Sequence, residues 1–374
     1  MTDSVPPPDD RGTPTPPFAP VEANAPQPVA GAPLPYSANV PGGPVMVPAG
    51  WTQLPPPPPP VESPTAYHRL YRTNPRYRWW RPLVAVLLFG VFALTALLAL
   101  NIIWFVVAMA VGQVTLDDLA RPDFADWLVA LLSDITNPLS LVMLLGSLAV
   151  LLPLVPLALL CAGIRPVGVT SSVAFRLRWR WMLRCAVPAL VVTAVSIGLP
   201  WIIAPFTGET ITPVEVDPAL FALLAVIIVL LVPLQATAEE YIFRGLLLQV
   251  VGAWVKAWPL AVVIATILFT IGHTQYEIWG MLSVAVMGLG FAIVTLRTGG
   301  LEAAIALHVI NNVAAFLVLT SGIQGTTQMS SEGSGPLAPL TQLVLTVAYV
   351  LWVDRLASKQ GIARRRDLAL EPVR

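Results

Sequence analysis

The feature that most constrains the fold of this chain is a series of long apolar stretches. An α-helix needs about 20 apolar residues to cross the hydrocarbon core of a bilayer. The stretches that meet or approach this length are roughly 84–112, 137–163, 182–206, 218–236, 259–275, 278–297, 301–320 and 337–354. We expect the fourth to continue as a helix through residue 254. The pattern predicts an all-α fold, a polytopic membrane bundle of about eight transmembrane helices.

The composition agrees with this prediction. Hydrophobic residues make up 56% of the chain and charged residues only 11%, whereas soluble proteins carry about 25% charged residues. No soluble domain of useful size fits between the apolar stretches. The basic and aromatic residues are not organised as a nucleic-acid-reading surface, so we expect a lipid bilayer and no nucleic acid among the partners.

The charges that flank the apolar stretches alternate in sign. Arginines precede the first and third stretches and follow the last, whereas acidic connections precede the second and fourth. The basic residues are Arg69, Arg72, Arg76, Arg78, Arg81, Arg165, Arg176, Arg178, Arg180, Arg184 and Arg364–Arg366. Because basic loops stay in the cytoplasm, both termini are expected there, in a plasma membrane of bacterial type.

The two ends of the chain differ from its centre. Of the 38 prolines, 21 fall within residues 6–64, and such a composition does not form helix or sheet. We therefore expect a disordered cytoplasmic tail over 1–80, with a polyproline II rod at Pro55–Pro60 that a proline-binding partner would recognise. The bundle should follow over 81–356, and a short basic cytoplasmic tail over 357–374.

Two adjacent carboxylates, Glu239 and Glu240, interrupt the apolar pattern. A charged side chain at the centre of a membrane helix costs about 2.5–3.5 kcal/mol on insertion scales. Glu240 and Arg244 are four residues apart and can form an ion pair on one helix face. Glu239 points about 100° away and is expected to lack a partner, which makes it the catalytic candidate. The alternative is that both glutamates cap a cytoplasmic helix start.

Two of the three histidines also lie in apolar stretches. His273 follows Phe269 by one helical turn, and His308 precedes Asn312 by the same spacing, so each pair shares a helix face. Taken alone, His273 is typical of a packed or interfacial histidine. The His308–Asn312 pair alone equally fits a hydrogen-bond clamp between helices. Together, three apolar stretches each supply groups that activate water or stabilise an anion.

The ordered set Glu-Glu-x-x-x-Arg, Phe-x-x-x-His and His-x-x-x-Asn resembles the CAAX protease and bacteriocin-processing (CPBP or Abi) family of intramembrane proteases. The resemblance covers about residues 180–320. It implies a helical bundle with a water-accessible cavity, and an endopeptidase that cleaves a peptide or a membrane-protein substrate. The implied roles are water activation by Glu239 and His273, support by Glu240 and Arg244, and oxyanion stabilisation by His308 and Asn312.

The family has been described both as metal-dependent and as glutamate-type. Glu239, His273 and His308 would make three ligands for a divalent metal such as zinc, with an open position for water. The sequence contains no His-Glu-x-x-His motif, which argues against an obligatory zinc ion. Both a metal-dependent and a glutamate-type mechanism therefore stay open at this point.

The predicted boundaries raise a difficulty of depth. Glu239 lies near the end of the fourth stretch, whereas His273 lies about 21 Å into the fifth and His308 about 10 Å into the seventh, at 1.5 Å per residue. A shared site requires the fourth stretch to run longer, with Glu239 nearer its middle. Pro233 is a candidate kink.

Two other classes of function fit parts of the pattern. Relatives of this family are linked to bacteriocin immunity or to scaffolding, so a non-proteolytic membrane binding protein is one alternative. A proton-coupled transporter is the other, because buried Glu and His groups form proton relays. Transporters often contain internal repeats, and this sequence shows no convincing duplication.

Overall fold

The structure is a computed structural model that describes residues 63–207, 211–327 and 335–367. Most of the predicted Pro-rich tail, including the expected rod at Pro55–Pro60, lies outside the described residues. The α-helices are α1 Arg81–Ala110, α2 Phe124–Ser133, α3 Pro138–Ala149, α4 Leu154–Cys161, α5 Trp179–Thr207, α6 Pro218–Glu240, α7 Leu248–Trp254, α8 Trp258–Ile271, α9 Ile278–Thr298, α10 Glu302–Thr320 and α11 Leu337–Lys359. The other elements are β1 Thr65–Ala66, η1 Tyr67–Thr73, η2 Asp118–Ala120, η3 Val167–Thr170, η4 Tyr241–Leu247 and β2 Arg365–Arg366.

The predicted helical membrane bundle is confirmed. Seven helical segments among the described residues are long and apolar enough to cross a membrane. The fifth predicted stretch forms α8, which has only 14 residues and reaches about 21 Å at 1.5 Å per residue. The protein is therefore an integral membrane protein with seven candidate spans and a shorter apolar helix.

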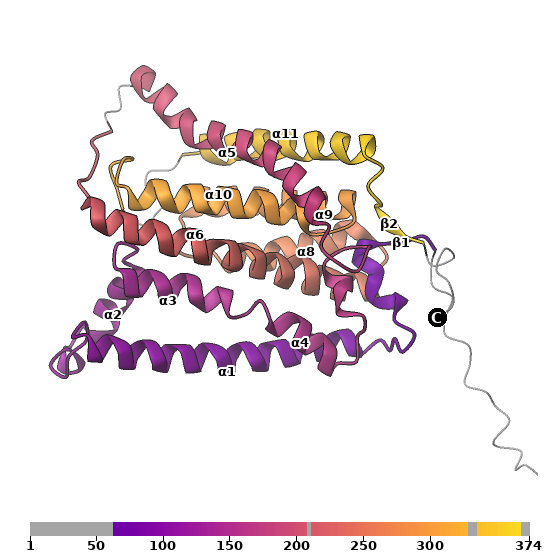
Figure 1. Ribbon diagram of the computed structural model, residues 1–374, viewed down its shortest axis with the longest axis horizontal. Helices are drawn as coiled ribbons and strands as arrows, with labels where there is room; N and C mark the ends of the chain where they lie inside the picture. Colours follow the sequence, from indigo (N-terminus) through magenta and orange to yellow (C-terminus); the bar gives the residue numbers. More distant parts are fainter. Residues whose placement is uncertain (1–62, 208–210, 328–334, 368–374) are drawn as a thin grey trace, which may run out of the picture. The chain divides into compact units, whose positions relative to one another are not determined.

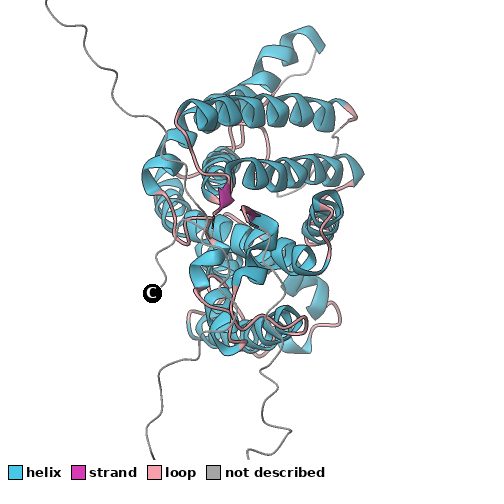
Figure 2. Ribbon diagram, turned by 90° about the vertical axis from the view of Figure 1, so that its right-hand side faces the viewer, coloured by secondary structure: helices cyan, strands magenta, loops and turns pink. Residues whose placement is uncertain are grey.

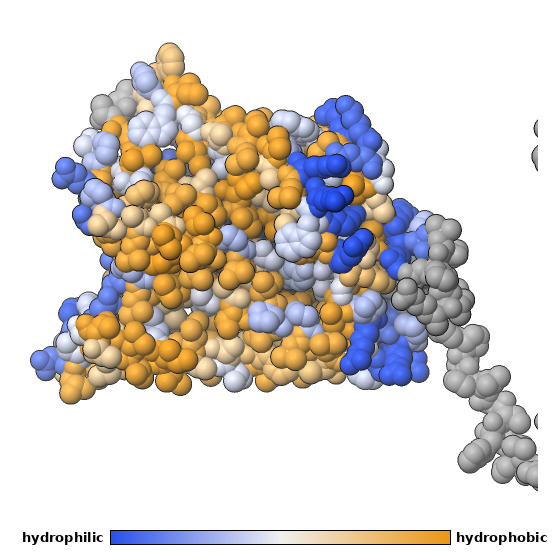
Figure 3. Space-filling model, in the orientation of Figure 1, coloured by the Kyte–Doolittle hydropathy of each residue, from blue (hydrophilic) through white to orange (hydrophobic). Residues whose placement is uncertain are grey.

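Large apolar side chains cover the sides of the bundle (Figure 3). On α1, for example, Leu87, Leu94 and Ile102 are each about three-fifths exposed. Monomeric soluble proteins rarely expose contiguous apolar surface of this extent. Lipid contact explains it, since the hydrocarbon core removes these side chains from water.

Helix α6 does not stop at the paired glutamates. It continues through the π-helical segment η4 into α7, so that Pro218–Trp254 forms one helical run of 37 residues. The predicted extension through residue 254 is confirmed. Pro233 lies inside α6, in the turn before Glu239. Glu239 thus lies well inside the run rather than at its end.

Helix α10 lies within the bundle, where it packs against α5, α6 and α9 (Figure 1). Helix α11 packs against α9 and α5, α3 packs against α6, and α8 packs against α9. The first turns of α10 are fully surrounded, because the side chains of Glu302–His308 are all buried. This helix therefore begins inside the bundle and carries His308 into its interior.

The segment before α1 is packed, so the predicted boundary of the disordered tail at residue 80 is wrong. Helix η1 packs against α7, and its Tyr71 hydroxyl donates to the Gly245 carbonyl at 3.0 Å. A Cβ atom on Gly252 would lie 1.9 Å from the His68 carbonyl oxygen, so only glycine permits this approach. Strand β1 pairs with β2, which joins the two ends of the described chain (Figure 2).

Candidate active site

The paired glutamates lie in the interior, where α6 passes into η4. Glu239 is 5% exposed, and both Glu240 and Arg244 are fully buried. Arg244 Nη1 donates to Glu240 Oε1 at 2.9 Å, which confirms the predicted ion pair. π-Helical segments are rare and often occur at functional sites. Here the segment begins directly after Glu240 and contains Arg244.

Arg244 is held from several sides. Its Nη2 donates to the Gly288 carbonyl on α9 at 2.9 Å, and its guanidinium carbon lies 4.4 Å from the Phe269 ring centroid and 5.1 Å from that of Phe291. Such cation–π contacts are strongest when both groups are removed from water. The arrangement compensates the burial of the Arg244 charge and fixes the position of Glu240.

His308 lies between the two glutamates. Its Nδ1 is 2.7 Å from Glu240 Oε1, and its Nε2 is 3.6 Å from Glu239 Oε2. An ionised carboxylate only accepts hydrogen bonds. The Nδ1 atom of His308 therefore carries a proton and donates a hydrogen bond to Glu240. The Phe291 ring stacks on the imidazole with centroids 4.9 Å apart. His308 on α10 thus makes polar contacts with both glutamates of the α6–η4 run.

Glu239 also has a partner that the sequence analysis missed. Gln235 Nε2 donates to Glu239 Oε1, and Asn312 Nδ2 donates to Gln235 Oε1 at 3.4 Å. The expectation that Glu239 lacks a partner is wrong. Gln235 lies one turn before Glu239 on the same face of an otherwise apolar helix, and this spacing was the signal in the sequence.

His273 lies in the turn after α8, beside these groups. Its Nδ1 donates to the Phe269 carbonyl at 2.8 Å, and its ring centroid lies 4.6 Å from that of Phe269. The Phe269 ring contacts His308 in turn, with centroids 6.1 Å apart. No hydrogen bond or ion pair joins His273 to Glu239 or His308 among the described residues.

A cavity of about 330 Å³ connects the histidines. His273, His308 and Asn312 line it together with Tyr276, a residue that the sequence analysis did not select. Tyr276 stacks on His273, with ring centroids 6.4 Å apart, and its burial raises the pKa of its hydroxyl. His273, His308 and Asn312 thus share one cavity with the Tyr276 hydroxyl, and His308 connects this cavity to Glu239 and Glu240, which do not line it.

The predicted difference in membrane depth between Glu239 and His273 is not found, because α7 and α8 form a hairpin. Glu239 lies 15 residues before Trp254, the end of α7, and His273 lies 15 residues after Trp258, the start of α8. At 1.5 Å per residue both are about 22 Å from the turn. His308 reaches the same level because α10 begins inside the bundle.

The predicted metal ligands are not arranged as a ligand set. Among the residues that the structure describes, no group of three His, Cys, Asp or Glu side chains lies close enough together to hold a metal ion. Glu240 and the Phe269 carbonyl hold the Nδ1 atoms of His308 and His273, respectively, and leave both Nε2 atoms available, so it is the spacing of the three side chains that separates them from a ligand set. Glu239, His273 and His308 therefore do not fit a zinc site in this arrangement.

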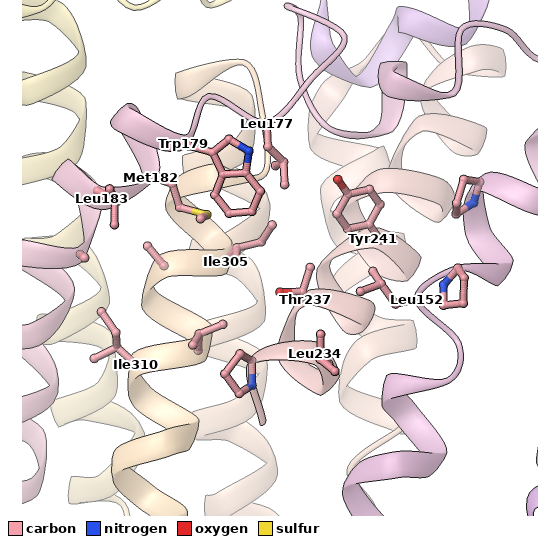
Figure 4. A pocket seen from close by; sticks show the side chains of 16 residues that line it. Leu152, Leu177, Trp179, Met182, Leu183, Leu234, Thr237, Tyr241, Ile305 and Ile310 are labelled. Carbon is pink, nitrogen blue, oxygen red and sulfur yellow. The ribbon is translucent and has the colours of Figure 1, made fainter. Parts of the chain in front are cut away.

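A larger cavity lies elsewhere in the described region, and it is almost purely apolar. It encloses about 670 Å³ between α4, α5, α6 and α10, with Thr237 and Tyr241 facing it (Figure 4). Thr237 on α6 and Tyr241 at the start of η4 project from the side of the helical run roughly opposite to Gln235 and Glu239. We therefore assign the candidate site to the cavity that adjoins the acid–base groups, although it is the smaller of the two.

Comparison with known proteins agrees with the region of the site. Residues 218–314 match the family described as "Type II CAAX prenyl endopeptidase Rce1-like". Over 112 residues the chain is 29% identical to the "Uncharacterized protein YyaK" of Bacillus subtilis (strain 168), covering 28% of this chain and 38% of that relative. No solved structure matches. Residues 218–314, which carry all the candidate site residues, are a Rce1-like domain of the CAAX protease and bacteriocin-processing family.

Proposed function

We propose that this protein is an intramembrane endopeptidase. It hydrolyses a peptide bond with water activated by Glu239 and His273, and it stabilises the oxyanion with His308 and Asn312. The observation that carries the proposal is the contact of His308 with both glutamates, beside a cavity that His273 and Asn312 also line. Hydrolysis needs a base and hydrogen-bond donors at one place, and this cluster contains both.

Glu239 is suited to accept a proton from water. Gln235 holds its Oε1 atom, whereas its Oε2 atom is buried and accepts no hydrogen bond from the described residues. His273 offers a second acceptor, because the proton on Nδ1 faces the Phe269 carbonyl and leaves Nε2 unprotonated in the neutral ring. A water in the cavity would meet one or both acceptors.

The donors for the oxyanion follow from the same contacts. Asn312 donates one amide hydrogen to Gln235, and its second amide hydrogen can be donated to the oxyanion. Because the Nδ1 proton of His308 faces Glu240, its Nε2 donates only when the ring carries two protons. The imidazolium would then lie between the carboxylates of Glu239 and Glu240.

The proposed substrate is a peptide or the tail of a membrane protein that enters the cavity. The proposed setting is the plasma membrane of a bacterium, with both termini in the cytoplasm, as the alternation of basic and acidic connections suggests.

The test is a comparison of purified Glu239→Gln and Glu277→Gln proteins on a fluorogenic membrane-tethered peptide. Both substitutions remove one carboxylate, but Glu277 is exposed at the start of α9. We expect Glu239→Gln to fold, to bind the peptide and to lack turnover, while the control retains it. Normal turnover by Glu239→Gln would refute the assigned base. Peptide binding without any turnover by the wild-type protein would favour a non-proteolytic binding protein.

A further inference from the structure

A second polar cavity lies at the end of the bundle where β1 and β2 pair (Figure 2). It encloses about 370 Å³, and its wall combines segments from both ends of the described chain with α8 and α9. Three arginines line it, namely Arg297, Arg364 and Arg365. It takes no part in the proposed catalysis, since none of the candidate catalytic residues lines it.

The arginines leave this cavity with excess positive charge. Asp354 forms ion pairs with Arg297 at 2.8 Å and with Arg364 at 3.1 Å. The single negative charge of Asp354 therefore balances only one of these two positive charges. Arg365 is exposed, and its side chain forms no ion pair with the residues that the structure describes. Three positive charges against one negative charge favour an anionic ligand. Guanidinium groups match phosphate oxygens in a bidentate manner.

Apolar side chains also line the cavity. Ile293 and Leu296 from α9 line it with Trp258, the first residue of α8, which is 50% exposed. Tryptophan is enriched where a membrane helix meets the headgroup layer. Figure 3 shows hydrophilic surface at this end of the bundle next to the apolar sides. A ligand that fills the cavity would therefore carry a phosphate and an alkyl chain.

We propose that this cavity binds an anionic phospholipid. Its phosphate contacts the arginines, above all Arg365, and the start of an acyl chain lies against Trp258, Ile293 and Leu296. Basic pockets between membrane helices commonly bind anionic headgroups. The bound lipid would hold β2, which carries Arg365, and β1, which leads to η1, against α9.

The experiment uses the full chain, purified in uncharged detergent and stripped of lipid. Phosphatidylglycerol, phosphatidylcholine and inorganic phosphate are added separately, and bound lipid is counted by native mass spectrometry and by titration. Three variants accompany the wild type. Arg365→Gln removes the unpaired charge, Arg365→Lys keeps it, and Arg180→Gln removes an exposed arginine at the start of α5, outside the cavity.

We expect phosphatidylglycerol to bind the wild type and Arg180→Gln alike. Arg365→Gln should weaken binding about tenfold or more, because it removes the charge-assisted hydrogen bonds of the guanidinium to the phosphate, and Arg365→Lys should recover part of it. Equal affinity for phosphatidylcholine, or equal losses in Arg365→Gln and Arg180→Gln, would overturn the proposal. Full displacement of the lipid by millimolar inorganic phosphate would assign the cavity to free phosphate and also overturn it.

Discussion

His308 lies between Glu240, whose Oε1 atom is 2.7 Å from its Nδ1, and Glu239, whose Oε2 atom is 3.6 Å from its Nε2. The two glutamates are therefore not equivalent, although they are neighbours in the sequence. Glu240 is fixed by both Arg244 and His308. Among the described residues Glu239 has no arginine partner, and its one hydrogen bond comes from the uncharged Gln235. Each glutamate keeps one buried oxygen, Oε2, that accepts no hydrogen bond from the described residues.

Glu240→Gln should destabilise the protein more than Glu239→Gln does. The substitution leaves the Arg244 guanidinium buried without its carboxylate, and breaking a buried pair in this way costs about 3–5 kcal/mol. Chemical unfolding in detergent micelles measures the difference. The double variant Glu240→Gln/Arg244→Met should recover much of the loss. A Glu240→Gln protein as stable as the wild type would contradict the structural role of the pair.

Gln235→Leu should lower turnover while the fold survives. Glu239 would lose the donor that orients its Oε1 atom, and a hydrogen bond to a charged group is worth about 1.5–3 kcal/mol, so kcat should fall about tenfold or more with little change in KM. The matched control is Thr237→Val, on the same helix facing the apolar cavity. Equal effects of both substitutions would mean that Gln235 acts only through helix packing.

Gly288→Ala should disturb the candidate site from a distance. The added Cβ would lie 2.8 Å from Phe269 Cδ1 and 3.3 Å from Arg244 Nη2. Overpacking of this kind typically costs about 1–3 kcal/mol. In Gly146→Ala the Cβ would meet no atom within 4 Å, and a helical Gly→Ala change there should stabilise by about 0.5–1 kcal/mol. Thermal unfolding of the two variants would separate them, and a stabilised Gly288→Ala protein would contradict the close packing.

The buried Tyr276 hydroxyl should make stability fall at alkaline pH. Burial raises the pKa of Tyr276 in the folded protein, whereas in the unfolded chain it stays near 10. Above that pH the unfolded state binds fewer protons than the folded state, so the free energy of unfolding decreases as pH rises. Tyr276→Phe should make this decline shallower. Melting temperatures between pH 8 and 11 test it, and parallel curves for the two proteins would refute the assignment.

Chelation of divalent metals should leave peptide hydrolysis intact. Glu239, His273 and His308 are not arranged as a ligand set, and no such set of three occurs elsewhere in the described part of the chain. Turnover is measured before and after dialysis against a strong chelator, with added zinc as the reverse arm. Loss of activity that zinc restores would show that the site rearranges around a metal ion.

The sequence by itself determined the membrane fold and most members of the candidate site. Apolar stretches near the length of a bilayer core leave few structures other than a helical bundle. The four-residue spacing of Glu240 and Arg244 was enough to predict their ion pair, because that spacing fixes neighbours on a helix. These conclusions depend on local periodicity, which a single sequence records.

Only the tertiary structure decided how these groups meet. The hairpin of α7 with α8 and the buried start of α10 bring Glu239, His273 and His308 to one level, and neither follows from periodicity. The turn of His308 toward both carboxylates and the packing of residues 65–80 were likewise beyond reach. They depend on contacts between residues far apart in sequence, which form only when the helices pack.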